Sequence, residues 1–133
     1  MERWLGPWSD SCYAVLRIVA ALLYLCHATQ KLFGVPGGRA VAGNPLLQTA
    51  AVIELIAGVL IALGLYTTYA AFLASGEMAA AYFTVHFWNG FWPILNRGEL
   101  PVLFCFLFLF LFIDSRGAGP LSLDRLRQRE PPR

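Results

Sequence analysis

The chain has 133 residues, of which 58% are hydrophobic and 14% charged, and its formal net charge is +2. With a mean hydropathy of +0.59, it is too apolar for a soluble domain of this size and too poor in charge for a disordered chain. Most of the positive excess lies near the C-terminus, so a basic surface for nucleic acid is not supported. One membrane domain is the prediction.

Residues 11–33 are predicted to form the first membrane-spanning helix, because about 20 apolar residues at about 1.5 Å each cross the hydrocarbon core. The ten residues before it, with Trp4 and Trp8, fit an interfacial lead. Arg17 interrupts the apolar run, which is not typical of a cleavable signal peptide. We therefore expect a retained anchor.

Three further apolar runs predict spans over residues 46–65, 69–88 and 100–113. Gly58 and Ala62 form a small-x-x-x-small pair that favours close helix approach. Phenylalanines alternate along the fourth run as in a strand, but a lone strand cannot satisfy its backbone in lipid, so a helix is predicted there. Rings spaced by two spread around a helix and favour broad lipid contact.

Four spans place both termini and the Tyr66 turn on the same side of the membrane. That side carries Arg3, Arg116, Arg125, Arg127, Arg129 and Arg133, and the other side carries Lys31, Arg39 and Arg97. By the positive-inside rule, both termini are predicted to be cytoplasmic. The expected fold is an all-α, four-transmembrane-helix bundle over residues 1–115, followed by a basic cytoplasmic tail over residues 116–133, part of which forms a short amphipathic helix on the membrane.

Ionisable residues inside the spans converge on the outer half of the membrane. Each costs roughly 3 kcal/mol on insertion scales and usually has a partner or a function. Because the spans alternate in direction, His27 and Lys31 fall in the outer part of the first span, Glu54 about 12 Å below the outer start of the second, and Glu77 near mid-depth of the third, with His86 at the rim. We predict that they form a polar pocket opening outward.

Arg17 is the exception to this convergence, since it falls in the inner half. Arg17, Tyr24 and Lys31 are separated by seven residues each and therefore share one stripe of the first helix. Arg17 is expected either to snorkel toward the cytoplasm or to reach Glu77.

Two roles remain open for the carboxylates and histidines. Glu54 and Glu77 either carry protons and bind a ligand oxygen, or form structural pairs with Lys31, Arg17 or His27. His27 and His86 either bind a quinone carbonyl or a metal, or bond neighbouring helices. Glu77 and His86 are nine residues apart, which on a straight helix points them to opposite faces.

Cysteine and aromatic residues give weaker signals. Cys12, Cys26 and Cys105 have no metal-ligand spacing, so no metal site is expected, and a bridge between the last two is disfavoured. Trp88 and Trp92 either anchor the interface or stack on a quinone ring.

Several segments resemble the DoxX family of small membrane proteins. They are residues 16–18 and 27–34, Glu54 to Gly58, Gly76 to Phe83, His86 to Pro93, Asn96 to Leu100, and Ser122 to Asp124. One departure is Ala28-Thr29, where the family often has Gly after the His. The resemblance implies a four-helix inner-membrane protein with oxidoreductase associations, including thiosulfate:quinone oxidoreductase subunits, or an accessory, chaperone-like protein. The matching polar positions are His27, Gln30, Lys31, Glu54, Glu77, His86, Asn89, Asn96 and Glu99.

Two functions follow as hypotheses. The first is an accessory subunit of a membrane redox system, with a pocket for a quinone or a small sulfur compound. No Cys pair, flavin fingerprint or Fe–S ligand set is evident, so such a subunit would not carry electrons alone. The second is a non-catalytic assembly or scaffold protein. Both predict the lipid bilayer and either another membrane protein or further copies of this chain as partners.

Overall fold

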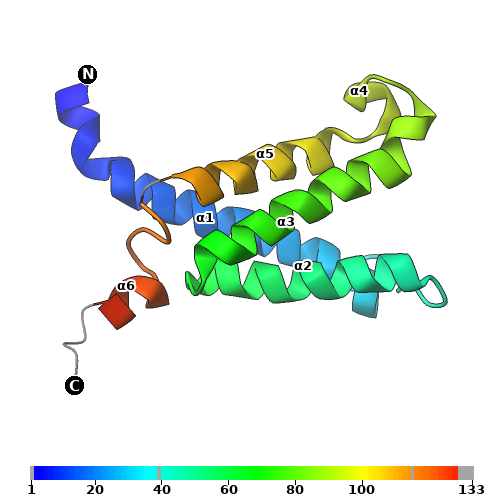
Figure 1. Cartoon of the computed structure of the whole chain (residues 1–133), viewed down its shortest axis with the longest axis horizontal. Coiled ribbons are helices and arrows are strands. Elements are labelled where there is room, and N and C mark those ends of the chain that lie inside the picture. Colours follow the sequence, from blue (N-terminus) through cyan, green and yellow to red (C-terminus); the bar gives the residue numbers. More distant parts are fainter. Residues whose placement is uncertain (1, 39, 115, 129–133) are drawn as a thin grey trace.

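The computed structural model describes residues 2–38, 40–114 and 116–128, and over these residues the chain is all-helical, without strands. Figure 1 shows four longer helices side by side, with α1 against α2 and α3 against α5, while α2 and α3 meet at their connecting turn. The longer helices are α1 (Glu2–Phe33), α2 (Pro45–Leu63), α3 (Thr67–Ala81) and α5 (Glu99–Ile113). The shorter ones are η1 (Tyr82–His86), η2 (Phe87–Asn89), α4 (Pro93–Asn96) and α6 (Leu123–Gln128).

Two helical segments are long and apolar enough to cross a membrane, Gly6–Phe33 within α1 and Pro45–Leu63. Helix α5 is apolar but shorter, with 15 residues. The described part of the chain is therefore all-helical and consistent with a membrane protein, as the composition predicts.

The helix boundaries differ from the predicted spans in two places. Helix α1 begins at Glu2, so the predicted interfacial lead continues the first span as helix. The third predicted run contains α3, a π-helical turn over η1, and a 3₁₀ turn over η2. At the other ends prediction and structure agree closely, because Asn44 caps α2 through its side chain and Gly64 ends it in the left-handed conformation.

Small residues allow the helices to pack closely. A Cβ atom at Gly58 would lie 2.8 Å from the Leu25 side chain, so the expected close approach occurs between α2 and α1. The predicted lipid contact of the α5 rings holds for part of the set only. Phe106 is 65% exposed, whereas Phe104 and Phe108 are buried against Tyr24.

Arg17 joins the C-terminal end of α2 to the tail, so it extends in the direction of the first predicted alternative, and the second, a contact with Glu77, is wrong. Its side chain is fully buried, and its Nη1 donates to the carbonyl oxygens of Ile61 at 2.6 Å and Ala62 at 3.1 Å. Its Nη2 donates to the Leu121 carbonyl at 2.7 Å. A cation at these carbonyls satisfies helix-end acceptors and the negative end of the helix dipole.

Asp124 makes the corresponding contact at the start of α3, where it accepts hydrogen bonds as Arg17 donates them at the end of α2. Its carboxylate accepts from the backbone N–H groups of Tyr66 at 3.0 Å and Thr67 at 3.2 Å, where the helix has no side-chain cap of its own. The Asp124 N–H donates to the Gly64 carbonyl at 2.9 Å. The segment from Arg116 to α6 is therefore attached to the α2–α3 turn, although the amphipathic helix itself is found close to where it is predicted.

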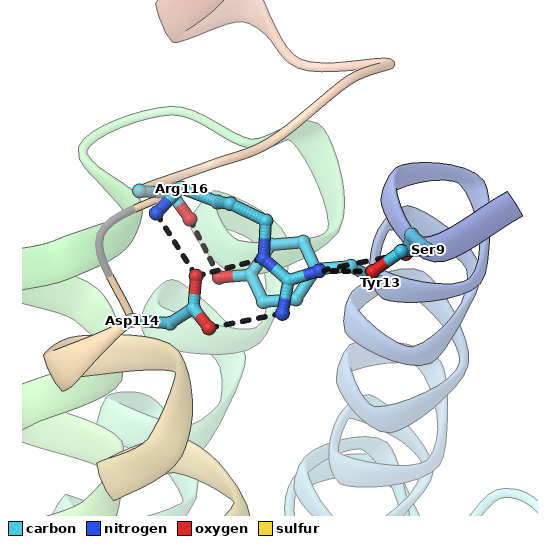
Figure 2. A network of polar contacts seen from close by, with 5 residues as sticks. Ser9, Tyr13, Asp114 and Arg116 are labelled. Atoms are coloured by element: carbon cyan, nitrogen blue, oxygen red, sulfur yellow. Dashed lines mark hydrogen bonds and ion pairs between the residues drawn. The ribbon is translucent and has the colours of Figure 1, made fainter. Parts of the chain in front are cut away.

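A second polar contact connects the end of α5 to α1. Figure 2 shows the Arg116 guanidinium over the Tyr13 ring, 4.2 Å from the ring centre, with the Asp114 carboxylate beside it. The Asp114 carboxylate accepts from Arg116 Nε at 2.8 Å and Nη2 at 2.9 Å, while Arg116 Nη1 reaches Ser9 Oγ at 3.2 Å. These bonds to Arg116 hold the pKa of Asp114 at about 2, below its usual value.

The depressed pKa of Asp114 predicts a pH dependence of stability. Its carboxylate stabilises the folded chain fully above its unfolded pKa of about 3.9, and this contribution is lost as pH falls through about 2. Thermal unfolding in detergent between pH 6 and pH 2 should show this loss, and Asp114→Asn should remove that part of the slope. An unchanged slope in the variant would contradict the prediction.

Candidate functional site

A cavity of about 580 Å³ lies between the helices at the end of the molecule away from the tail. Its walls come from the first half of α2, the second half of α3 with η1, and parts of α1 and α5. Ligand sites typically measure about 300–1,000 Å³ and combine apolar walls with a few polar groups. This cavity has both properties, since Leu47, Ile53 and Phe104 line it together with charged side chains.

An ion pair between α1 and α2 forms part of its wall. Lys31 Nζ lies 2.5 Å from Glu54 Oε1. Glu54 is 0% exposed, whereas the Lys31 side chain is 27% exposed. The other carboxylate oxygen, Glu54 Oε2, has no hydrogen-bond partner among the described residues. A buried carboxylate oxygen without a partner lacks the hydrogen bond that such groups usually have, and an ordered water or a ligand donor would supply it.

A second carboxylate reaches the cavity from α3. Tyr24, fully buried on α1, donates its hydroxyl to Glu77 Oε2 at 3.0 Å. The Tyr24 ring packs against both Phe104 and Phe108, with ring centres 5.9 and 4.8 Å away. The predicted stripe of Arg17, Tyr24 and Lys31 thus faces inward along its length, with Glu77 bound to its middle member.

The two histidines also line the cavity. His27 lies edge-on to Phe104 at 6.1 Å between ring centres. His86 Nδ1 is 3.1 Å from the Asn96 carbonyl oxygen, within hydrogen-bonding distance. A straight helix would point Glu77 and His86 apart, but the wider π-helical turn of η1 changes the register and brings both to the same cavity.

The four remaining polar candidates do not line the cavity. Gln30 donates to the Pro36 carbonyl at 3.0 Å and Asn89 to the Val85 carbonyl at 3.0 Å, both near the surface. Asn96 is buried and donates to the Gly90 carbonyl at 2.7 Å, so it shapes the loop between η2 and α5. Glu99 is exposed in the first turn of α5.

The aromatic and sulfur candidates are also separate from the cavity wall. Trp88 and Trp92 are 80% and 63% exposed, which favours their interpretation as interface anchors. The three cysteines are free. Among the described residues, no group of three or more His, Cys, Asp and Glu side chains is placed to hold a metal.

Sequence reasoning missed two members of the site. Tyr24 lies on the predicted stripe, but its bond to Glu77 depends on the rotation of α3, which spacing does not reveal. Arg97 lines the cavity from a left-handed backbone position (φ 59°) after α4. Arg97 falls inside the Asn96 to Leu100 segment that resembles the family, but an isolated arginine in a short loop has no spacing that would point it to the cavity.

The chemistry of the cavity follows from these contacts. Two carboxylates, an ammonium, a guanidinium and two imidazoles meet apolar walls, so the site can donate and accept hydrogen bonds and exchange protons. Most of the other lining side chains are apolar and suit hydrocarbon, among them Leu47, Ile53 and Phe104. A molecule with a small polar ring and an apolar remainder fits this division.

Comparison with known proteins places the chain in a family. Residues 12–87, which contain Tyr24, both histidines, Lys31, Glu54 and Glu77, match the DoxX family. A protein of Haemophilus influenzae, described as an uncharacterized protein, is 46% identical over 118 residues, covering 84% of this chain and 87% of its own length. No solved structure matches the chain. The resemblance seen in the sequence is thereby confirmed, and the chain belongs to the DoxX family.

Proposed function

We propose that this chain is a multi-pass protein of a bacterial-type inner membrane, crossing it through α1, α2, α3 with η1, and α5. Residues 1–115 would form the membrane domain, and residues 116–133 the basic tail. Arginines predominate at the end that carries both termini, which by the positive-inside rule favours a cytoplasmic location for that end. Helix α5 has 15 residues, about 22 Å at 1.5 Å each, and a short helix is accommodated by local thinning of the bilayer.

The function that the site supports best is binding of a quinone in an accessory subunit of a membrane redox system. The observation that carries this proposal is the meeting of Lys31, Glu54, Glu77 and both histidines at one apolar-walled cavity. The basic and acidic groups would orient the ring oxygens, and Glu77 and Glu54 would exchange protons with them. A partner protein would supply the electron-carrying group, since no such cofactor signature is evident in this chain.

The same cavity disfavours a small sulfur compound as the ligand. Such an anion has no apolar part to cover walls such as Ile53 and Phe104. It would also meet a fully buried carboxylate oxygen at Glu54. An anion placed there would meet a like charge, although Lys31 at 2.5 Å partly balances it, so this second penalty is the smaller one. A neutral, lipid-soluble ring avoids both penalties.

Replacing Glu77 by Ala should remove the bound quinone. The full-length chain is purified in mild detergent, its lipids are extracted, and quinone and quinol are measured by mass spectrometry. Because Glu77 is the carboxylate held in place by Tyr24, we expect at least about a tenfold loss, equivalent to about 1.4 kcal/mol.

Glu99→Ala is the matched control, since Glu99 is exposed and does not line the cavity. It should retain the quinone content of the unchanged chain. A quinone-free unchanged chain, or equal content in a well-folded Glu77→Ala variant, would contradict the proposal.

A scaffold role is the second candidate, and one observation favours it. Lys31 pairs with Glu54 and Tyr24 bonds to Glu77 within the chain, so these contacts also join helices without any ligand. In that case the chain would copurify with one membrane complex or with further copies of itself. Variants at Glu54 would then change stability only.

A further inference from the structure

We propose that the cavity is entered sideways from the bilayer, through the gap between α2 and α3, by an amphiphile that keeps its apolar tail in the lipid. This inference rests on the proposed function, because it concerns the ligand and route of the same site. Figure 1 shows α2 and α3 diverging from their common turn, and the cavity lies where they are apart.

The two sides of this gap are apolar and exposed. Leu46 on α2 is 64% exposed, and Phe72 and Leu73 on α3 are 61% and 48% exposed, although all three line the cavity. Side chains that face both lipid and cavity form a continuous apolar path between the two. The neighbouring helix pairs are in closer contact, because α1 packs tightly on α2 at Gly58, and Ser75 of α3 bonds to the Cys105 carbonyl of α5 at 2.8 Å.

Gly76 marks the opening on α3. It is exposed, it lines the cavity, and a Cβ atom at this position would meet no atom within 4 Å. Ala80, one turn further on the same face, is also small and exposed. A larger side chain at position 76 would therefore enter the opening without disturbing the packing of the chain.

At the inner end of the path, Glu54 determines which polar head group of the ligand can bind. Glu54 Oε2 is buried, has no partner among the described residues, and belongs to a side chain of the cavity wall. A carboxylate oxygen accepts, so a ligand that reaches Oε2 would offer it a donor, as the hydroxyl of a hydroquinone ring does. A hydroquinone with an alkyl tail satisfies both ends of the path.

The route is tested with a photoreactive azidoquinone bearing a decyl tail, reduced to its hydroquinone and mixed into vesicles that contain the full chain. Labelled peptides are identified by mass spectrometry. We expect label on residues 46–54 and 72–85, and at least about a tenfold lower yield in Gly76→Leu, since even one methylene group in an apolar site changes binding by about tenfold or more. A tail-free azidohydroquinone should label far less.

Gly6→Leu is the matched control, because Gly6 is also a helical, exposed glycine with open space around it but does not line the cavity. It should leave the yield unchanged. If Glu77→Ala abolishes labelling and Gly76→Leu does not, the lateral route is wrong while quinone binding stands. If neither variant has an effect, quinone binding itself fails.

Two further outcomes would overturn the route. Equal labelling by the tail-free probe would show that the ligand needs no apolar tail. Absence of label on residues 72–85 together with a dimer in native mass spectrometry would show that a second copy of the chain covers the gap.

Discussion

Lys31→Met should destabilise the folded chain by about 3 kcal/mol. The substitution removes the ammonium in contact with Glu54, whose side chain is 0% exposed and remains buried without that partner. Glu54→Gln should cost less, about 1 kcal/mol, because the Lys31 side chain is 27% exposed and can turn toward the polar rim. Thermal unfolding in mild detergent, with each variant at equal protein concentration, shows which of the two substitutions costs more stability.

The double variant Lys31→Met/Glu54→Leu separates structure from binding. Replacing both partners of a buried pair by apolar residues is often neutral or stabilising, so most of the lost stability should return. Retained stability with lost quinone would show that the pair also binds the ligand. If the double variant is as unstable as Lys31→Met, the loss does not come from the unpaired carboxylate of Glu54.

The convergence of the charged groups is predictable because helix rise fixes depth. Counting about 1.5 Å per residue from each predicted span end places Lys31, Glu54 and Glu77 between the outer end and the middle of the spans, and they do line one cavity. Their pairing is not predictable in the same way, since it depends on how each helix is rotated about its axis. That rotation is set by packing, for example by Gly58 against Leu25, and not by the charged residues themselves.

The position of His86 shows a different limit. Period counting assumes a regular helix, and under that assumption Glu77 and His86 point apart. The helix is not regular here, because Tyr82–His86 forms a π-helical turn. No residue in that stretch is one whose type would predict such a turn. Turns of this kind are frequent at functional sites, which is where regular patterns fail most often.

The tail is the least predictable element, because backbone atoms are its main partners. Arg17 donates to carbonyl oxygens, and Asp124 accepts mainly from backbone N–H groups, with one longer bond from the Thr67 hydroxyl at 3.4 Å, so among the described residues neither has an oppositely charged partner that the sequence would reveal. Interpreting Arg17 as a partner for Glu77 overlooks the free carbonyls that every helix end presents. Together the two contacts cap α2 and α3 from one segment.

Arg17→Met should therefore loosen both helix ends and the tail. Three hydrogen bonds from a charged donor are lost, and the acceptors at Ile61 and Ala62 lie where the arginine excluded water. Hydrogen bonds from charged groups contribute about 1.5–3 kcal/mol each, and with partial rescue by water we expect a total loss of about 3 kcal/mol. Thermal unfolding in detergent should show the loss.

Hydrogen exchange gives the second measurement, because it reports on the tail directly. The Asp124 amide, which donates to the Gly64 carbonyl, should exchange faster in Arg17→Met than in the unchanged chain. Arg125→Met is the matched control, since that arginine is exposed on α6, and surface substitutions usually stay within about 0.5 kcal/mol. If Arg17→Met leaves both stability and Asp124 exchange unchanged, Arg17 does not hold the tail, and the α2–α3 turn must be stabilised by Asp124 alone.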